Sequence, residues 1–244
     1  MTLLDLGRLR GPWPGRAIDY YTTIGSTMDA AAGRPVGTVV IAEEQTAGQG
    51  RLGHSWHSEV GSGIYFSIVL KPAPLLTLAL GLATAEAITG ATGVVCDLRW
   101  PNDVMSGGRK LAGVLTKLVD GAAVAGIGIN VNHTAFPAEI AELATSLRLQ
   151  AGREFDRMDI LLALIPAVER WAGEESETIL RRFEKASSWI SGRRVTVDQT
   201  DGSTIEGTTS GLDPAGFLVV RKDDGTDTLI LAGGVRAAGT GCGQ

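Results

Sequence analysis

The sequence predicts an α+β protein in which a mixed β-sheet flanked by helices is followed by a small C-terminal β-barrel. Two observations indicate this architecture. Strand-like apolar runs alternate with helical segments over residues 17–188, and short apolar runs separated by turn dipeptides then follow. The 244 residues suffice for one sizeable core and a second, smaller domain. We therefore predict a loosely ordered segment over residues 1–16, a main domain over 17–188 and a barrel over 189–244.

Composition and charge exclude several classes of protein. The formal net charge is −5, whereas nucleic-acid binding relies on clustered Lys and Arg, so we expect no nucleic-acid partner. Residues 73–96 carry Glu86 as their single charge, but several threonines and the lack of flanking anchors disfavour a membrane span. The two cysteines, Cys96 and Cys242, form no disulfide or metal-binding pattern, so we expect a cytoplasmic protein.

The elements of the first half follow from the spacing of its apolar residues. A short helix is expected over residues 26–32, with Ser26 as its cap. The apolar run 74–89 is expected to be a buried helix with Pro74 near its first turn. Strands are expected over residues 17–21, 38–43, 64–70 and 94–100.

The second half contains a hairpin, helices and the barrel. Strands over 111–119 and 123–131 are joined by Asp120-Gly121, a hairpin turn signal. Helical spacing over 155–189 is interrupted by Pro166 and Gly173, which predicts two or three shorter helices. The barrel strands are expected around Val195–Val197, Ile205, Phe217–Val220 and Leu229–Leu231.

Glycines combined with cations mark the candidate site. Residues 48–56 contain three glycines around Arg51, and Lys110 opens an apolar strand that contains Gly113. Such segments let the backbone approach an anion closely while cations hold it. Between them, Asn102 and Asp103 follow the strand 94–100. Each segment alone is also compatible with a structural role, as a surface turn or as a strand-edge lysine.

Together and in this order, these segments resemble those of biotin protein ligases. The resemblance covers about residues 17–190, the last domain matches the small SH3-like C-terminal domain of that family, and the main domain is similar to the biotin/lipoate ligase catalytic domain. It implies the short, monofunctional type without a DNA-binding domain. The segments that carry it are Ser26-Thr27, Gln45 through Trp56, Trp100-Pro101-Asn102-Asp103, Lys110-Leu111-Ala112-Gly113 and Gly126-x-Gly128-x-Asn130.

The resemblance implies a two-step ligase reaction. Biotin and ATP form biotinyl-5′-AMP and pyrophosphate, and biotin then passes to one lysine of a biotin carboxyl carrier domain of acyl-CoA carboxylases. Mg²⁺ is expected to arrive with ATP, near Asp103, with no fixed protein site. The resemblance also implies a monomer or a homodimer. Because a free lysine has a pKa of about 10.4, the acceptor must lose a proton, and Asp103 is the expected helper.

The resemblance also implies the site residues. The catalytic group comprises Arg51, Asn102, Asp103 and Lys110, and the two cations offset the repulsion between biotin carboxylate and phosphate. The residues expected around biotin are Ser26, Thr27, Gln45, Gly48, Arg51, Lys110, Gly113, Leu115 and Gly126. Those expected around ATP or the adenylate are Arg51, His54, Trp56, Asn102, Lys110 and Asn130.

Departures from the family pattern and two alternatives remain. Gln49 and His54 stand where arginines are typical. Since a free imidazole is mostly neutral at pH 7, we expect weaker retention of the adenylate. A lipoate or octanoate ligase is the nearest alternative, but it would line its slot with apolar residues, whereas Ser26, Thr27 and Gln45 are polar. The second alternative is a non-catalytic biotin-binding module. It is disfavoured because the expected catalytic residues Arg51, Asp103 and Lys110 are all present.

Overall fold

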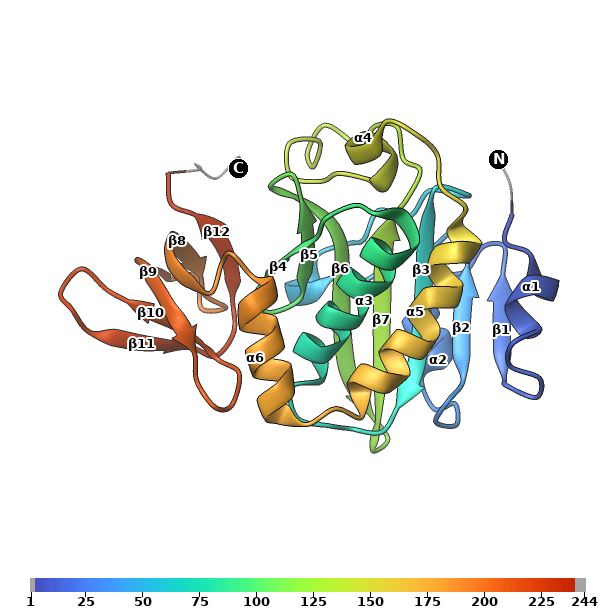
Figure 1. Cartoon of the computed structure of the whole chain (residues 1–244), viewed down its shortest axis with the longest axis horizontal. Coiled ribbons are helices and arrows are strands. Elements are labelled where there is room, and N and C mark those ends of the chain that lie inside the picture. The colour runs from blue at the N-terminus through green and yellow to red at the C-terminus, as the bar shows by residue number, and fades with distance from the viewer. Residues whose placement is uncertain (1–2, 240–244) are drawn as a thin grey trace.

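Seven strands form one mixed sheet in the larger part of the computed structural model, which describes residues 3–239 (Figure 1). The strand order is β1-β2-β3-β7-β6-β5-β4; β1 pairs with β2 in parallel and every other pair is antiparallel. The predicted mixed sheet is therefore confirmed. The strands are β1 (Ile18–Tyr21), β2 (Val39–Ala42), β3 (Gly63–Leu70), β4 (Asp97–Arg99), β5 (Asp103–Ser106), β6 (Arg109–Val119) and β7 (Ala122–Asn130).

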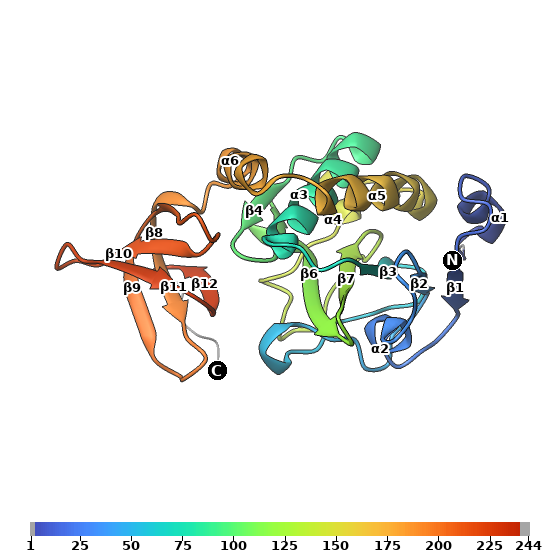
Figure 2. The ribbon, with the colours of Figure 1, turned by 90° about the horizontal axis from the view of Figure 1, so that it is seen from below.

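Helices cover the two faces of this sheet unequally. The long helices α3 (Leu76–Thr92) and α5 (Arg157–Ala172) lie on one face, and the short α2 (Thr27–Ala31) lies on the other (Figure 2). Apolar side chains from the sheet, α3 and α5 form the main core, whereas α2 shares only a small cluster with the opposite face. The second face is thus left largely open.

The alternation of side chains along β7 prepares that open face. Successive residues in a strand point to opposite sides of the sheet. Ala125, Ile127 and Ile129 enter the main core beneath α3 and α5. Gly126 and Gly128, in the intervening positions, present bare backbone to the other side. The glycines of the Gly126-x-Gly128 segment therefore face away from the core.

The C-terminal strands form a separate five-stranded antiparallel sheet, as expected for the predicted SH3-like barrel. Its order is β11-β10-β9-β8-β12. Trp100 joins the two domains, because its indole N–H donates to the carbonyl oxygen of Gly216 at 2.9 Å. Cys242 lies outside the described residues. The strands are β8 (Ser191–Asp198), β9 (Thr204–Leu212), β10 (Leu218–Arg221), β11 (Asp227–Ile230) and β12 (Gly234–Ala237).

The N-terminal segment differs from the predicted loose order. It contains α1 (Leu6–Arg10), whose cap Asp5 accepts hydrogen bonds from two backbone amides. Leu9 is buried, and Arg8 forms ion pairs with Asp156 and Asp159 at 2.6 and 2.7 Å. A composition rich in Gly, Pro and Arg hides this helix, because its anchors are distant in sequence.

Most predicted helices and turns are confirmed, with shifted boundaries. Asp120 and Gly121 make the hairpin turn with φ of 49° and 78°. Pro166 lies inside α5, and the break comes at Gly173, after which α6 (Ser176–Ala186) follows. The expected strand 94–100 shrinks to β4. The sequence prediction missed α1, α4 (Leu147–Ala151), β5, β12 and the 3₁₀ turn Arg51–Gly53. Among residues 3–239, no helix is both long and apolar enough to span a membrane.

Candidate active site

A small pocket of about 40 Å³ lies on the sheet face opposite α3 and α5, between α2, the glycine-rich loop, β6 and β7. The structure brings most of the predicted site residues together here. Met28 and Phe66, which sequence reasoning did not assign, also line it, as does Gly128 of the Gly126-x-Gly128 segment. The predicted residues that line it are Ser26, Thr27, Gln45, Arg51, Trp56, Asn102, Lys110, Gly113, Leu115 and Gly126.

One end of the pocket is a polar network around Gln45. Its Oε1 accepts from the backbone N–H and the hydroxyl of Thr27, at 2.8 and 3.0 Å, and its Nε2 donates to Ser58 Oγ at 3.2 Å. Ser67 Oγ donates to the Thr27 hydroxyl at 2.8 Å. Ser26 caps α2 and so aims its first turn at the pocket. Ser58 and Ser67 were missed, although Ser67 is the one polar side chain besides Tyr65 in the β3 sequence Gly63–Leu70.

The floor of the pocket consists of glycines beneath the indole of Trp56. A β-carbon on Gly128 would lie 2.4 Å from Trp56 Cε2, and one on Gly113 would lie 2.9 Å from Cζ3. Gly126, which is expected to contact biotin, lies under the Met28 sulfur, which a β-carbon would approach to 2.7 Å. The Trp56 N–H is buried and has no hydrogen-bond partner among the described residues. Displacing the indole therefore breaks no hydrogen bond within the protein, and the exposed Trp56 N–H would form a hydrogen bond with water.

Two cations and a carboxylate form the charged end. Lys110 Nζ lies 2.6 Å from Asp103 Oδ1 and 5.4 Å from the Trp56 ring centroid. Arg99 donates to Asp103 Oδ2 through Nε and Nη2, at 3.1 and 2.6 Å. Burial alone would raise the pKa of Asp103, but Lys110 and Arg99 outweigh it and hold that pKa below its ordinary value. Asp103 is therefore an anchored anion at neutral pH.

Arg51 reaches across from the glycine-rich loop. Its Nη1 donates to Asn102 Oδ1 at 3.1 Å and to the Gly233 carbonyl oxygen of the C-terminal domain at 3.3 Å. Asn102 is itself fixed, because its Nδ2 donates to the carbonyl oxygen of Val114 at 3.0 Å. Burial lowers the pKa of Arg51 while the Asp103 charge opposes that shift, and a guanidinium remains protonated. Asn102 thus positions the loop cation.

The glycine-rich loop is a closed hairpin. Gly50 N donates to the His54 carbonyl oxygen at 2.7 Å, and Trp56 N donates to the Gly48 carbonyl oxygen at 2.9 Å. A β-carbon on Gly48 would lie 2.7 Å from the Trp56 carbonyl oxygen, so only glycine fits there. Gln49 donates to both carboxylate oxygens of Asp29 on α2, at 2.9 and 2.8 Å. Gln49, one of the two residues expected to depart from the family pattern, therefore ties the loop to α2.

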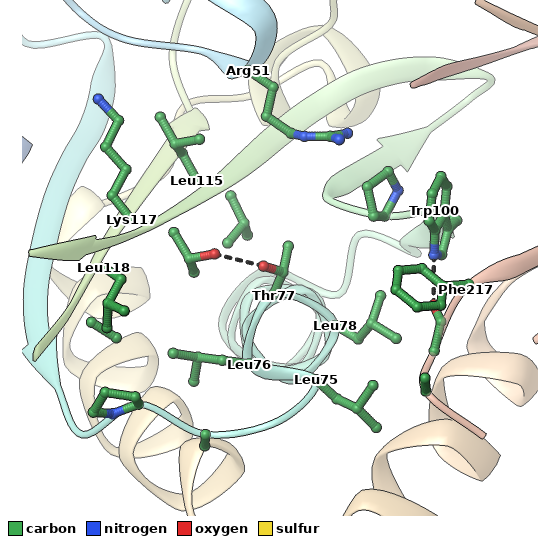
Figure 3. Close-up of a pocket in the computed structure, with 18 of the residues that line it drawn as sticks. Arg51, Leu75, Leu76, Thr77, Leu78, Trp100, Leu115, Lys117, Leu118 and Phe217 are labelled. Carbon is green, nitrogen blue, oxygen red and sulfur yellow. Dashed lines mark hydrogen bonds between the residues drawn. The ribbon is translucent and has the colours of Figure 1, made fainter. Parts of the chain in front are cut away.

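A second cavity, of about 420 Å³, shares Arg51, Val114 and Leu115 with this pocket. Figure 3 shows the Arg51 side chain reaching into it from one side, across from the start of α3. Phe217 lines it from the C-terminal domain. Two hydrogen bonds stiffen its wall: Thr77 to Thr116 at 2.7 Å, and Trp100 to Gly216 (Figure 3). Arg51 therefore stands between the pocket and an interdomain space.

Four predicted residues do not line the pocket. Asp103 adjoins it through Lys110, and Gly48 and His54 belong to the hairpin above it. Asn130 lies at the end of β7, where its Nδ2 donates to the Thr145 carbonyl oxygen at 3.0 Å. Its role toward the nucleotide stays a prediction, because nothing in the geometry turns it toward the pocket.

Comparison with known proteins places this fold and site in the biotin/lipoate ligase class. Residues 22–133 match the Biotin/lipoate A/B protein ligase family, and residues 190–235 match the Biotin protein ligase C terminal domain. A Biotin--[acetyl-CoA-carboxylase] ligase from Mycobacterium tuberculosis is 32% identical over 239 residues, covering 90% of this chain and 88% of that protein. The chain belongs to the biotin protein ligase family.

Two further relatives agree with this placement. The Bifunctional ligase/repressor BirA of Bacillus subtilis is 31% identical over 239 residues, covering 89% of this chain and 73% of that protein. The solved structure of a biotin protein ligase from Aquifex aeolicus in complex with biotin and ATP superposes with a TM-score of 0.83. That structure is 30% identical and covers 91% of this chain and 99% of its own.

Proposed function

We infer that this protein is an ATP-dependent ligase that activates biotin as biotinyl-5′-AMP and transfers the biotinyl group to a protein lysine. The observation that carries the conclusion is the convergence of Arg51 and Lys110 on a glycine-floored pocket with a polar far end. The relatives named as biotin ligases and the Aquifex aeolicus complex with biotin and ATP support the same assignment.

The chemistry requires what the pocket supplies. In the first step the biotin carboxylate attacks the α-phosphorus of ATP; an O–P bond forms and pyrophosphate leaves. In the second step the lysine amine attacks the acyl carbon, and AMP leaves with the electron pair of the broken C–O bond. Both reactants of the first step are anions, so preorganised cations lower its barrier. We assign that role to Lys110 and Arg51.

Asn102 and Asp103 act on these cations. Asn102 holds Arg51, and Asp103 holds Lys110 through an ion pair of 2.6 Å. We propose that both are positioning residues. The proton-accepting role that the resemblance implies for Asp103 stays a prediction, and its lowered pKa makes it a weak base.

Among the described residues that line the pocket, no carboxylate is available to bind the metal that accompanies ATP. Both carboxylate oxygens of the adjacent Asp103 face cations. Hard Mg²⁺ prefers oxygen ligands and is commonly held by substrate phosphates. We therefore propose that Mg²⁺ enters as MgATP, bound by the phosphates.

The polar network of Thr27, Gln45 and Ser67 selects the acyl substrate. A ureido ring offers two N–H donors and a carbonyl, which hydroxyl and amide groups can satisfy, whereas the tail of lipoate or octanoate would leave those groups unpaired. ATP–pyrophosphate exchange with biotin, lipoate and octanoate tests this directly. Exchange should occur with biotin alone. Exchange with the fatty acids alone would assign the chain to lipoate chemistry, and no exchange would leave a binding module.

The acceptor is a separate proposal. Relatives are named biotin--[acetyl-CoA-carboxylase] ligases, so we propose the biotin carboxyl carrier domain of an acyl-CoA carboxylase as the partner. The interdomain cavity beside Arg51 is the proposed entry for its lysine. Incubation of a carrier domain with enzyme, biotin and ATP should add one biotin by mass spectrometry. Substitution of the carrier's acceptor lysine should abolish the addition. The oligomeric state, monomer or homodimer, stays a prediction.

A further inference from the structure

Three potential metal ligands lie close together where the chain enters β3 and leaves β7. The start of β3 pairs with the end of β7, with Gly63 opposite Asn130. Ser62 continues this contact, because its carbonyl oxygen accepts from the amides of Val131 and Asn132 at 3.1 and 2.7 Å. The residues just before β3 therefore lie beside those just after β7. His57 and Glu59 come from the first segment and His133 from the second.

The cluster has the composition of a metal site. His57, Glu59 and His133 each offer one ligand atom, and these atoms lie within 4.8 Å of one another. Two imidazoles and a carboxylate form a common three-ligand set for zinc. A tetrahedral ion with bonds of about 2.0–2.1 Å needs ligand atoms about 3.3 Å apart. Because Glu59 is exposed, rotation of its side chain can bring its carboxylate oxygen to the separation from the imidazole nitrogens that such an ion needs.

His133 is the fixed member of the cluster. It is fully buried, and its Nδ1 has no hydrogen-bond partner among the described residues. Its Nε2 lies 3.5 Å from the hydroxyl of Tyr65, which donates to the Glu59 carbonyl oxygen and accepts from the Glu59 amide. The hydroxyl lone pair that remains suits an Nε2–H donor, which leaves the lone pair on Nδ1 available to a metal.

Aromatic surroundings shield the proposed ion position beside the buried His133 ring. Phe136 stacks on the His133 ring at 5.1 Å between centroids and presents its edge to His57 at 6.4 Å. An unpartnered imidazole nitrogen in such a place costs free energy, and coordination would recover it.

We propose that His57, Glu59 and His133 bind one Zn²⁺ ion, with water completing the coordination. Imidazole ligands suit zinc and disfavour Mg²⁺ and Ca²⁺, which prefer oxygen. The ion would fasten the segment 56–59 to the end of β7. Trp56 covers the glycine floor and Ser58 pairs with Gln45, so the ion would steady two residues of the active site without touching the reacting groups.

Zinc titration of the untagged full-length protein, freed of metal by a chelator, tests the proposal. Calorimetry should show one Zn²⁺ per chain. His57→Ala and Glu59→Gln should each weaken zinc binding by at least about tenfold. His54→Ala is the matched control, because His54 is an exposed histidine three positions before His57, and it should bind zinc as the wild type does. MgCl₂ should give no comparable heat.

Hydrogen exchange supplies the second readout. Zn²⁺ should slow exchange of the amides between residues 56 and 60 in the wild type and leave them unchanged in Glu59→Gln, which is a surface change that should not impair folding. Failure to bind zinc, equal weakening in His54→Ala, or binding without protection of this segment would each overturn the proposal. These measurements need neither biotin nor ATP, so they stand or fall separately from the proposed ligase activity.

Discussion

The two faces of the seven-stranded sheet are built from the same strands but differ in every physical respect. On the face beneath α3 and α5, β3 presents Ile64, Phe66 and Ile68 to a continuous apolar core. On the other face the intervening Ser67 joins the polar network of the pocket. The first face supplies most of the burial that stabilises the fold, and the second supplies hydrogen-bonding groups, cations and bare backbone.

This difference shows how one strand can serve stability and function independently. Because the side-chain period is two, a change on one face leaves the side chains of the other face in place. Packing therefore depends on Ile127 and Ile129, while the space above the open face depends on Gly126 and Gly128. Glycine weakens a strand, so its use twice on one face indicates a requirement for close approach.

Neighbouring substitutions on β7 test this separation. Ile129→Ala should reduce the free energy of unfolding by about 2–5 kcal/mol through lost burial and a cavity, yet leave biotin affinity of the folded protein nearly unchanged. Gly128→Ala should leave the free energy of unfolding nearly unchanged but reduce biotin affinity. Its β-carbon occupies the floor whether the indole or a ligand lies there, so biotin affinity should fall at least about tenfold. Denaturant unfolding and biotin calorimetry on both variants measure the two effects. Equal loss of stability in both would contradict the separation.

The charged end of the open face should dominate catalysis. Lys110→Met removes a cation that faces the pocket and should slow biotin-dependent ATP–pyrophosphate exchange by about 10²–10³-fold, the usual effect of losing one preorganised donor. Arg109→Met is the matched control, because Arg109 is the adjacent, exposed cation of the same strand. Exchange should be near wild type in that variant. Comparable losses in the two variants would show that net charge, not the placement of Lys110, matters.

The sequence sufficed for much of the fold because its signals were local. The Asp120-Gly121 turn, the Ser26 cap and the apolar run of β3 each depend on a few consecutive residues. The docked α1 was missed because its anchors, Asp156 and Asp159, are about 150 positions away. β5 was missed because the hairpin with β4 is too short to show a period.

The sequence could predict which residues form the site but not how their side chains contact one another. The resemblance brought Arg51, Asn102 and Lys110 to one place, and the structure shows them adjoining the pocket. It could not show that Asn102 holds Arg51 or that Trp56 covers Gly128, because those contacts depend on side-chain conformation. Ser58 and Ser67 belong to the polar network, but a single serine in each segment carries no local signal of that role.

The ion cluster around Asp103 should give the open face a pH dependence. A carboxyl whose pKa is lowered by folding stabilises the protein above its unfolded pKa, about 3.9, and loses that contribution as the pH falls through the folded value. Asp103→Asn should therefore cost about 1–3 kcal/mol at pH 7. The difference from wild type should shrink as the pH falls below about 4.

Urea unfolding of both proteins between pH 7 and pH 3 measures this effect. Asp227→Asn is the control, because Asp227 pairs with Arg221 on the exposed surface of the barrel and should change stability little at either pH. A difference between wild type and Asp103→Asn that stays constant across the range would mean that the cluster does not hold an ionised Asp103.

The smallest expected effect concerns the loop above the open face. His54 is exposed at the end of the Arg51–Gly53 turn, at a position where the sequence resemblance implies an arginine. A fixed charge there would attract the adenylate phosphate across solvent, which is a weak, salt-screened interaction. His54→Arg should therefore slow release of biotinyl-5′-AMP a few-fold at low salt, in a filter-binding chase. Val36→Arg adds the same charge to an exposed position outside the loop and should leave release unchanged. If His54→Arg releases the adenylate as fast as wild type, charge at position 54 does not govern retention.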